Sequence, residues 1–262
     1  MRSCVQIRLQ NSFIYTISAK NGSNDRKRIP VVFISMYIFG ICGWVGNIDH
    51  IAKDRTVYVF DLLGLSSRPI FNRDPTLIEE EYVRSIEDWR MEMGIDKMIL
   101  VAHSYGGYLA ASYALAYPNR ICHLVLVEPW GFEEKKKCKS RQVNIYIFAT
   151  ILRLSGPFAL TLLRILRPDL PNYFNGKNAD AIYDYIYKCH IKPPTGEIAF
   201  SNMSYSHGWA KRPMVERSFD LEVSTTFIYG SRSWMDHTLG HLIKFQRPDV
   251  DTDIHVRFRD HS

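Results

Sequence analysis

The stretch MILVAHSYGGYLAASYALAYPNR, residues 98–120, decides the fold. An apolar run leads to Ser104, two glycines follow at positions 106 and 107, and a small-residue pattern typical of a helix completes the segment. A strand that passes its chain to a helix through such a corner needs small neighbours, because strand and helix then lie in contact. The pattern predicts a strained turn that lifts the hydroxyl of Ser104 above the edge of a sheet, with an ordinary strand-to-helix loop as the alternative.

Segments that resemble strands and helices alternate on either side of this corner. Apolar or alternating runs predict strands at 6–18 (antiparallel), 31–34, 56–60, 98–101, 123–127, 225–229 and 253–258. Apolar residues at helical spacing predict helices at 76–93, which stops at Gly94, and at 109–117. This alternation is typical of an α/β fold with a mostly parallel sheet and helices on both faces.

Residues 133–220 break this alternation. They contain no strong strand, two or three helical stretches, and a cluster of prolines and aromatic residues. We interpret them as an inserted helical cap, which divides the chain into a first part of the core (1–132), the cap (133–220) and a second part of the core (221–262). Within the cap, arginines interrupt the apolar segment 144–170, so it predicts a packed helix pair or a lid rather than a membrane span.

The charge balance favours anionic surfaces. The 262 residues carry a formal net charge of +6, which suits phospholipid headgroups. Apart from the basic run at 135–139, the lysines and arginines are scattered, so nucleic acid is not an expected partner. The five cysteines form no C-x-x-C pair. We therefore expect no metal, no cofactor, no disulfide framework and a reducing compartment.

Residues 29–48 contain no charged side chain and follow a basic triplet, a pattern that would also suit a transmembrane helix. Pro30, three glycines and the β-branched run VVFI instead indicate a buried strand. We prefer the strand and keep the membrane span as a hypothesis. The first residues lack the apolar centre of a signal peptide, so no such leader is expected.

Further segments carry a family resemblance. VYVFDLLG (57–64), PWGF (129–132), GWAKRPM (208–214) and GSRSWMD (230–236) accompany the serine segment. Together they resemble the α/β-hydrolase-domain subfamily four and five over nearly the whole chain, as a divergent member that is short at both ends. The resemblance implies an α/β-hydrolase fold and one of two activities. One is a lipase acting on N-acylated phosphatidylethanolamines and their lyso forms, and the other is coactivation of adipose triglyceride lipase.

The resemblance also implies a set of site residues. A serine nucleophile needs a histidine base and an acid that orients it, in the order serine, acid, histidine along a chain of this fold. Ser104 is the implied nucleophile, Asp236 the acid and His261 the base, while the backbone N–H of Tyr105 is an oxyanion donor. A loop aspartate at 236 that only stabilises a turn is the alternative. Arg232 is the implied contact for a partner or substrate.

Two departures from the family weaken this machinery. After the strand 31–34 the family has His-Gly and further glycines, whose N–H groups donate to an oxyanion, whereas this chain has Ser35 and Met36. Near His261 the family's glycines are absent. His255 lies inside the last predicted strand and is interpreted as structural. With Asp260 it gives an H-x-x-x-x-D spacing associated with acyltransferases, but the two residues would face opposite sides of a strand.

The sequence therefore predicts a serine-type carboxylic ester hydrolase acting on lysophospholipid or N-acyl phospholipid in lipid homeostasis, with impaired activity. A catalytically silent lipid-droplet coactivator of a triglyceride lipase is the alternative, and a lysophosphatidic acid acyltransferase follows from kinship alone. The expected partners are a lipid substrate, a triglyceride lipase and a peripheral membrane or lipid-droplet surface. The expected location is cytoplasmic, with the lipid droplet, a membrane surface or mitochondria as alternatives.

Overall fold

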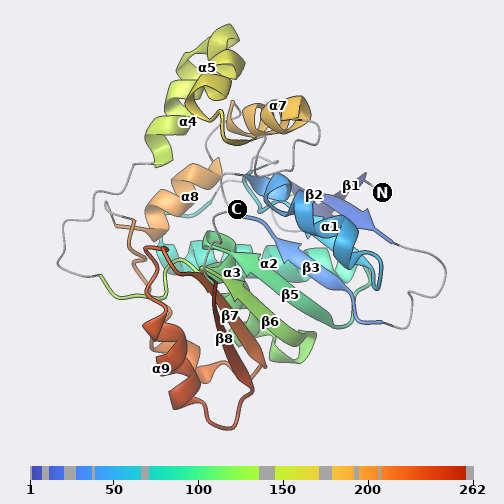
Figure 1. Ribbon diagram of the computed structural model, residues 1–262, viewed down its shortest axis with the longest axis vertical. Helices are drawn as coiled ribbons and strands as arrows, with labels where there is room; N and C mark the ends of the chain where they lie inside the picture. The colour runs from blue at the N-terminus through green and yellow to red at the C-terminus, as the bar shows by residue number, and fades with distance from the viewer. Residues whose placement is uncertain are drawn as a thin grey trace.

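One mixed sheet organises the computed structural model, which describes residues 2–7, 12–20, 28–36, 39–65, 71–135, 145–170, 179–191, 195–205 and 208–257. Within these residues the strands follow the order β1-β2-β4-β3-β5-β6-β7-β8 (Figure 1). They are β1 (Arg2–Ile7), β2 (Ser12–Ala19), β3 (Val31–Ile34), β4 (Val57–Phe60), β5 (Met98–His103), β6 (Ile121–Val127), β7 (Thr225–Gly230) and β8 (Thr252–Arg257). β2 is antiparallel to β1 and β4, and every later neighbour pair is parallel. The predicted α/β class is confirmed.

Helices pack on both faces of the sheet because alternate strand residues bury apolar side chains on each side. α2 (Pro75–Glu92), α3 (Tyr105–Ala116) and α9 (Thr238–Gln246) share one core, in which Trp89 and Leu109 are fully buried. On the other face α1 (Val45–Ile51) packs Ile48 near Val59. The sequence pattern predicts neither α1 nor α9, because both helices are short and expose most of their side chains.

The insertion between β6 and β7 is helical. It contains α4 (Ile145–Leu154), the 3-10 helix η5 (Gly156–Phe158), α5 (Ala159–Leu166), α7 (Ala179–His190) and α8 (Thr195–Met203). Its four described α-helices exceed the two or three that the sequence predicts. A separate core, which includes Leu152, Leu163 and Ile186, holds α4, α5 and α7 together. The predicted helical cap is thus present, while its boundaries at 133 and 220 stay a prediction.

Residues 29–48 do not form a membrane span. They contain β3, the 3-10 helix η3 (Gly40–Trp44) and the start of α1, while residues 37–38 lie outside the described part. Across the described segments, every helix is too short or too polar to cross a membrane. The transmembrane hypothesis is therefore wrong, since the apolar run supplies a central strand whose four residues are all buried.

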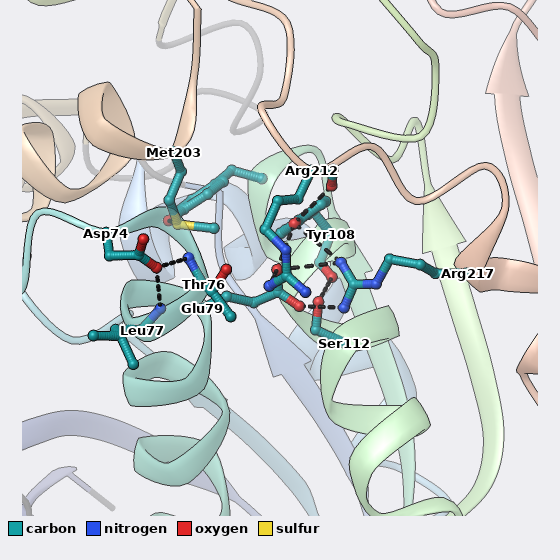
Figure 2. A network of polar contacts seen from close by, with 10 residues as sticks. Asp74, Thr76, Leu77, Glu79, Tyr108, Ser112, Met203, Arg212 and Arg217 are labelled. Atoms are coloured by element: carbon teal, nitrogen blue, oxygen red, sulfur yellow. Dashed lines mark hydrogen bonds and ion pairs between the residues drawn. The ribbon is translucent and has the colours of Figure 1, made fainter.

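A buried carboxylate joins the segment that leaves the cap to the core (Figure 2). Glu79 of α2 accepts hydrogen bonds from the hydroxyl of Tyr108 at 2.6 Å, from Arg212 at 3.0 Å and from Arg217. Burial alone would raise the pKa of Glu79, but the hydrogen bonds from Arg217 and Tyr108 outweigh it, so this pKa is lowered. The GWAKRPM block, which contains Arg212 and ends three residues before Arg217, therefore fastens the end of the cap to α2 and α3.

Replacing Glu79 by Gln should lower the free energy of unfolding by about 2 kcal/mol, because two partly buried arginines then lose their anion. The lowered pKa means that the carboxylate stabilises the fold fully above the ordinary glutamate pKa, and that this contribution is lost as the pH falls through the lowered value. Urea unfolding at neutral and acidic pH measures both effects, and the difference between wild type and Glu79→Gln should narrow in acid.

Glu80→Gln is the matched control for this prediction. Glu80 forms an exposed ion pair with Arg84 on the same helix, which contributes about 0.5 kcal/mol or less. Equal losses of stability from the two variants would contradict the role given to Glu79.

Candidate functional site

Ser104 stands at the corner between β5 and α3. Its backbone has a φ of 53° and a ψ of −121°, a conformation that non-glycine residues seldom adopt and that costs on the order of 1–3 kcal/mol. Backbone hydrogen bonds hold the corner. The N–H of Ser104 donates to the carbonyl of Val127 at 3.0 Å, and its carbonyl accepts from the N–H groups of Gly107, Tyr108 and Trp130. The strained turn expected from the sequence is therefore present.

The residues around the corner are small because the space is small. A side chain at Gly106 would place its Cβ 2.8 Å from the carbonyl oxygen of Ser35, and one at Gly107 would lie 3.1 Å from the Cβ of Pro129. Ala102 is fully buried below the turn. Ser104 itself is half-buried, and its hydroxyl forms no hydrogen bond with any described residue. Within the described part of the chain, the hydroxyl of Ser104 therefore contributes no hydrogen bond to the fold.

Tyr105, whose N–H is the expected oxyanion donor, directly follows Ser104. α3 begins at Tyr105, so the N–H of this residue lies at a helix N-terminus, where the helix dipole favours negative charge. At the end of β3, the buried hydroxyl of Ser35 donates to the carbonyl of Phe60 at 3.2 Å. The indole N–H of Trp44 donates to the carbonyl of Ile34 at 3.1 Å. Packed side chains therefore occupy the strand end at which the family places its glycines, and the role of Tyr105 stays a prediction.

Asp236 follows β7 at the same edge of the sheet as Ser104, because β5, β6 and β7 are parallel neighbours. One carboxylate oxygen of Asp236 accepts hydrogen bonds from the N–H of Thr238 at 3.0 Å and from its hydroxyl at 2.6 Å. These contacts at the start of α9 are those of an aspartate that stabilises a turn. Its assignment as the catalytic acid stays a prediction beside that alternative.

Two carboxylates that the sequence analysis does not single out hold the loop after β7. Glu128 directly follows β6 and has a φ of 42°. Its side chain accepts from the N–H of Gly230 at 3.0 Å and lies 3.9 Å from the ring of His103. The interaction with His103, followed by the contact with Gly230, lowers the pKa of Glu128 against the opposing effect of burial. Glu133 accepts from the N–H of Asp236 at 2.8 Å. Both lie in the segment EPWGFEE (128–134), directly after a parallel strand. Residues at that end of a parallel strand often belong to a binding site, so this position is the sequence signal that could have indicated the two glutamates.

The remaining predicted residues are spread more widely. His261 and Asp260 lie outside the described residues. His255 is on β8 and exposed, as is Arg232 in the loop between β7 and Asp236. The structure therefore brings Ser104, the N–H of Tyr105 and Asp236 to one edge of the sheet, with Arg232 on the loop that carries the acid.

An apolar cavity of about 360 Å³ opens beside the corner. It is lined by Met36, Phe39, Gly43, Trp44, His103, Val127, Arg167 and Leu170. Val127 and His103 are the hydrogen-bond partner and the chain neighbour of Ser104, and the last two residues of the list come from the cap. This volume lies in the range of small-molecule sites. The hollow beside Asp236, at about 10 Å³, has room for about one water.

The parallel sheet and the strained serine at its edge place this chain in the class of α/β proteins with a hydrolase-type fold. Residues 35–247 match the family model of the alpha/beta hydrolase fold. The chain is 40% identical to a 1-acylglycerol-3-phosphate O-acyltransferase ABHD5 of Sus scrofa, over 92% of this chain and 74% of that relative. It is 42% identical to a (lyso)-N-acylphosphatidylethanolamine lipase of Homo sapiens, over 90% of this chain and 74% of that relative. The chain belongs to the α/β-hydrolase family, in the group that contains these two relatives.

Solved structures support the fold. A thermophilic esterase from Thermogutta terrifontis superposes with a TM-score of 0.65 at 17% identity, covering 98% of this chain and 90% of the esterase. A bacterial membrane phospholipase A gives a TM-score of 0.64 at 16% identity, covering 98% of this chain and 78% of the phospholipase. At such low identity the likeness extends to the fold alone. The α/β-hydrolase fold implied by the resemblance is confirmed.

The backbone strain at Ser104 predicts an unusual order of stability. Ser104→Gly should be about 1 kcal/mol more stable than Ser104→Ala, because glycine adopts a positive φ without steric cost. Urea unfolding of the two variants measures the difference. The control is the pair Ser112→Gly and Ser112→Ala in the interior of α3, where glycine should instead be less stable by about 1 kcal/mol. The same order at both positions would argue against a left-handed Ser104.

Proposed function

We propose that the chain is a lipid-directed serine hydrolase that cleaves a carboxylic ester of a lysophospholipid or an N-acyl phospholipid, with Ser104 as nucleophile. The observation that carries this proposal is the left-handed backbone of Ser104 at a strand-to-helix corner, because strain of this kind persists where the position of a side chain matters. The printed activity of the human relative, a (lyso)-N-acylphosphatidylethanolamine lipase, supports the substrate class. The protein would act from the cytoplasm on lipid at a membrane or droplet surface.

In the proposed reaction the hydroxyl of Ser104 attacks the ester carbonyl and its proton passes to a histidine, for which His261 is the candidate. Asp236 orients that histidine. The carbonyl oxygen becomes an oxyanion, which the N–H of Tyr105 and the N-terminus of α3 stabilise. The histidine then returns the proton to the departing alcohol, and water releases the acyl group from Ser104 by the same route.

The cavity supports a lipid in this role. Phe39, Trp44 and Leu170 give it an apolar wall suited to an acyl chain. The guanidinium of Arg167 lies 5.3 Å from the ring centre of Phe39 and donates two hydrogen bonds, at 2.9 and 2.8 Å, to the half-buried carboxylate of Asp169. A phosphate offers a guanidinium the same kind of paired acceptor oxygens as this carboxylate. The cavity therefore suits an amphiphile with an anionic headgroup.

Activity is expected to be low. The family's glycines after β3 are replaced by residues whose side chains pack on the strand end, including Ser35. Loss of one oxyanion donor reduces turnover by roughly a hundredfold or more.

A fluorophosphonate probe tests the proposed nucleophile, because it reacts with an activated serine even when turnover is slow. The folded wild-type protein should be labelled and Ser104→Ala should not. Ser231→Ala, which removes an exposed serine from the loop after β7, should be labelled like the wild type. Absence of label on the folded wild type, or equal label on Ser104→Ala, would remove the proposal.

A catalytically silent coactivator of a triglyceride lipase is the second candidate. It is favoured by the packed end of β3, where Trp44 and Ser35 stand in place of a glycine loop, and by the exposed Arg232. Acyl transfer, the activity printed for the Sus scrofa relative, has no separate support among the described residues, because Asp260, which pairs with His255 in the H-x-x-x-x-D spacing, lies outside them.

Addition of the chain to a purified triglyceride lipase tests the coactivator. Triglyceride hydrolysis should rise, and Arg232→Ala should abolish the rise if this loop contacts the lipase. Lys244→Ala, which removes another exposed cation from α9, should leave it unchanged. No rise with the wild-type chain would exclude this candidate.

A further inference from the structure

The cap ends in an apolar surface that faces away from the core. α4, η5 and α5 form a helical hairpin at the opposite end of the molecule from α9 (Figure 1). One side of the hairpin packs on α7 through a core that includes Leu152 and Leu163. Away from this core, Leu154, Phe158 and Ile165 of the hairpin face solvent and expose 82%, 74% and 68% of their surface.

These side chains belong to a larger group rather than to isolated positions. Ile151 and Leu166 of the same hairpin are also exposed, so large apolar residues reach solvent from α4, from η5 and from α5 within residues 151–166. Single exposed apolar residues are ordinary, but a group of them on one element marks a surface that meets a partner or a membrane. The hairpin is thus apolar on both its packed side and its exposed side.

The charge of the hairpin identifies the occupant. Residues 145–167 contain three arginines and no aspartate or glutamate. Arg153 is held by the buried Glu197. Arg164 forms an exposed ion pair with Asp180, and Arg167, just after α5, forms a half-buried pair with Asp169, each at 2.8 Å. A lipid phosphate can replace the exposed carboxylate of Asp180 at little cost. An apolar face bordered by arginines suits the boundary between headgroups and acyl chains of an anionic bilayer.

We propose that the exposed side of the α4–η5–α5 hairpin, carried by Leu154, Phe158 and Ile165, docks this chain on an anionic phospholipid membrane. The proposal rests on the proposed lipid hydrolase in one respect, which is that the docked hairpin would adjoin the cavity proposed to bind the lipid substrate. Arg167 and Leu170, which follow α5 directly, line the cavity that reaches His103 next to Ser104. A lipid that leaves the membrane at the hairpin would therefore enter the cavity at its cap side.

Flotation with vesicles of phosphatidylcholine and phosphatidylserine tests the docking surface. The wild-type chain should float with the vesicles, and less of it with vesicles of phosphatidylcholine alone. The variant Leu154→Gln/Phe158→Ser/Ile165→Gln should partition at least about tenfold less, since burying each such side chain changes a partition constant by roughly a factor of ten. Phe245→Ser on α9, where the side chain is 79% exposed, is the matched control and should float like the wild type.

Four further measurements separate the other outcomes. Phe158→Ser alone, in the turn between the helices, should show a smaller loss, and full flotation of both hairpin variants would overturn the proposal. A wild-type dimer that the triple variant dissociates in sedimentation velocity would also overturn it, because the surface would then bind a second copy. Ser104→Ala should float normally. If the wild type fails to float while a fluorophosphonate still labels Ser104, docking is excluded and the proposed hydrolase stands.

Discussion

The left-handed backbone of Ser104 is the constraint around which this edge of the sheet is arranged. Its N–H is bound by the carbonyl of Val127 on β6, and its carbonyl is bound by N–H groups of α3 and of Trp130. These bonds join β5, β6, α3 and the PWGF segment at one residue. They offset a conformational cost on the order of 1–3 kcal/mol and require glycine at position 106, where β3 leaves no room for a side chain.

Two carboxylates connect this corner to the loop after β7. Glu128 accepts from the backbone N–H of Gly230, and Glu133 accepts from that of Asp236. The segment that follows β6 therefore sets the position of the loop that carries the expected acid. At another point of the core, the carboxylate of Glu79 on α2 binds Arg217, which lies where the chain leaves the cap. The cap is therefore fixed where it rejoins the core, while its far end exposes an apolar hairpin.

The sequence predicts best where local pattern and packing agree. The run VVFI and the helix after Pro75 were predictable because burial on a strand and apolar spacing on a long helix leave strong signals. α1 and α9 were not predicted, since short helices with mostly exposed side chains leave weak ones. Glu128 and Glu133 were missed for another reason. Their partners are backbone N–H groups about a hundred residues further along the chain, which no local pattern encodes.

The most direct test of the account is a crystal structure of the chain trapped with a phosphonate that carries a long alkyl arm. The account predicts a bond from phosphorus to the Oγ of Ser104, a φ at this residue that remains positive, and an arm lying against Trp44 and Leu170 in the cavity. A phosphonate oxygen should accept from the N–H of Tyr105. An adduct on a different residue, or a Ser104 with an ordinary negative φ, would contradict the account.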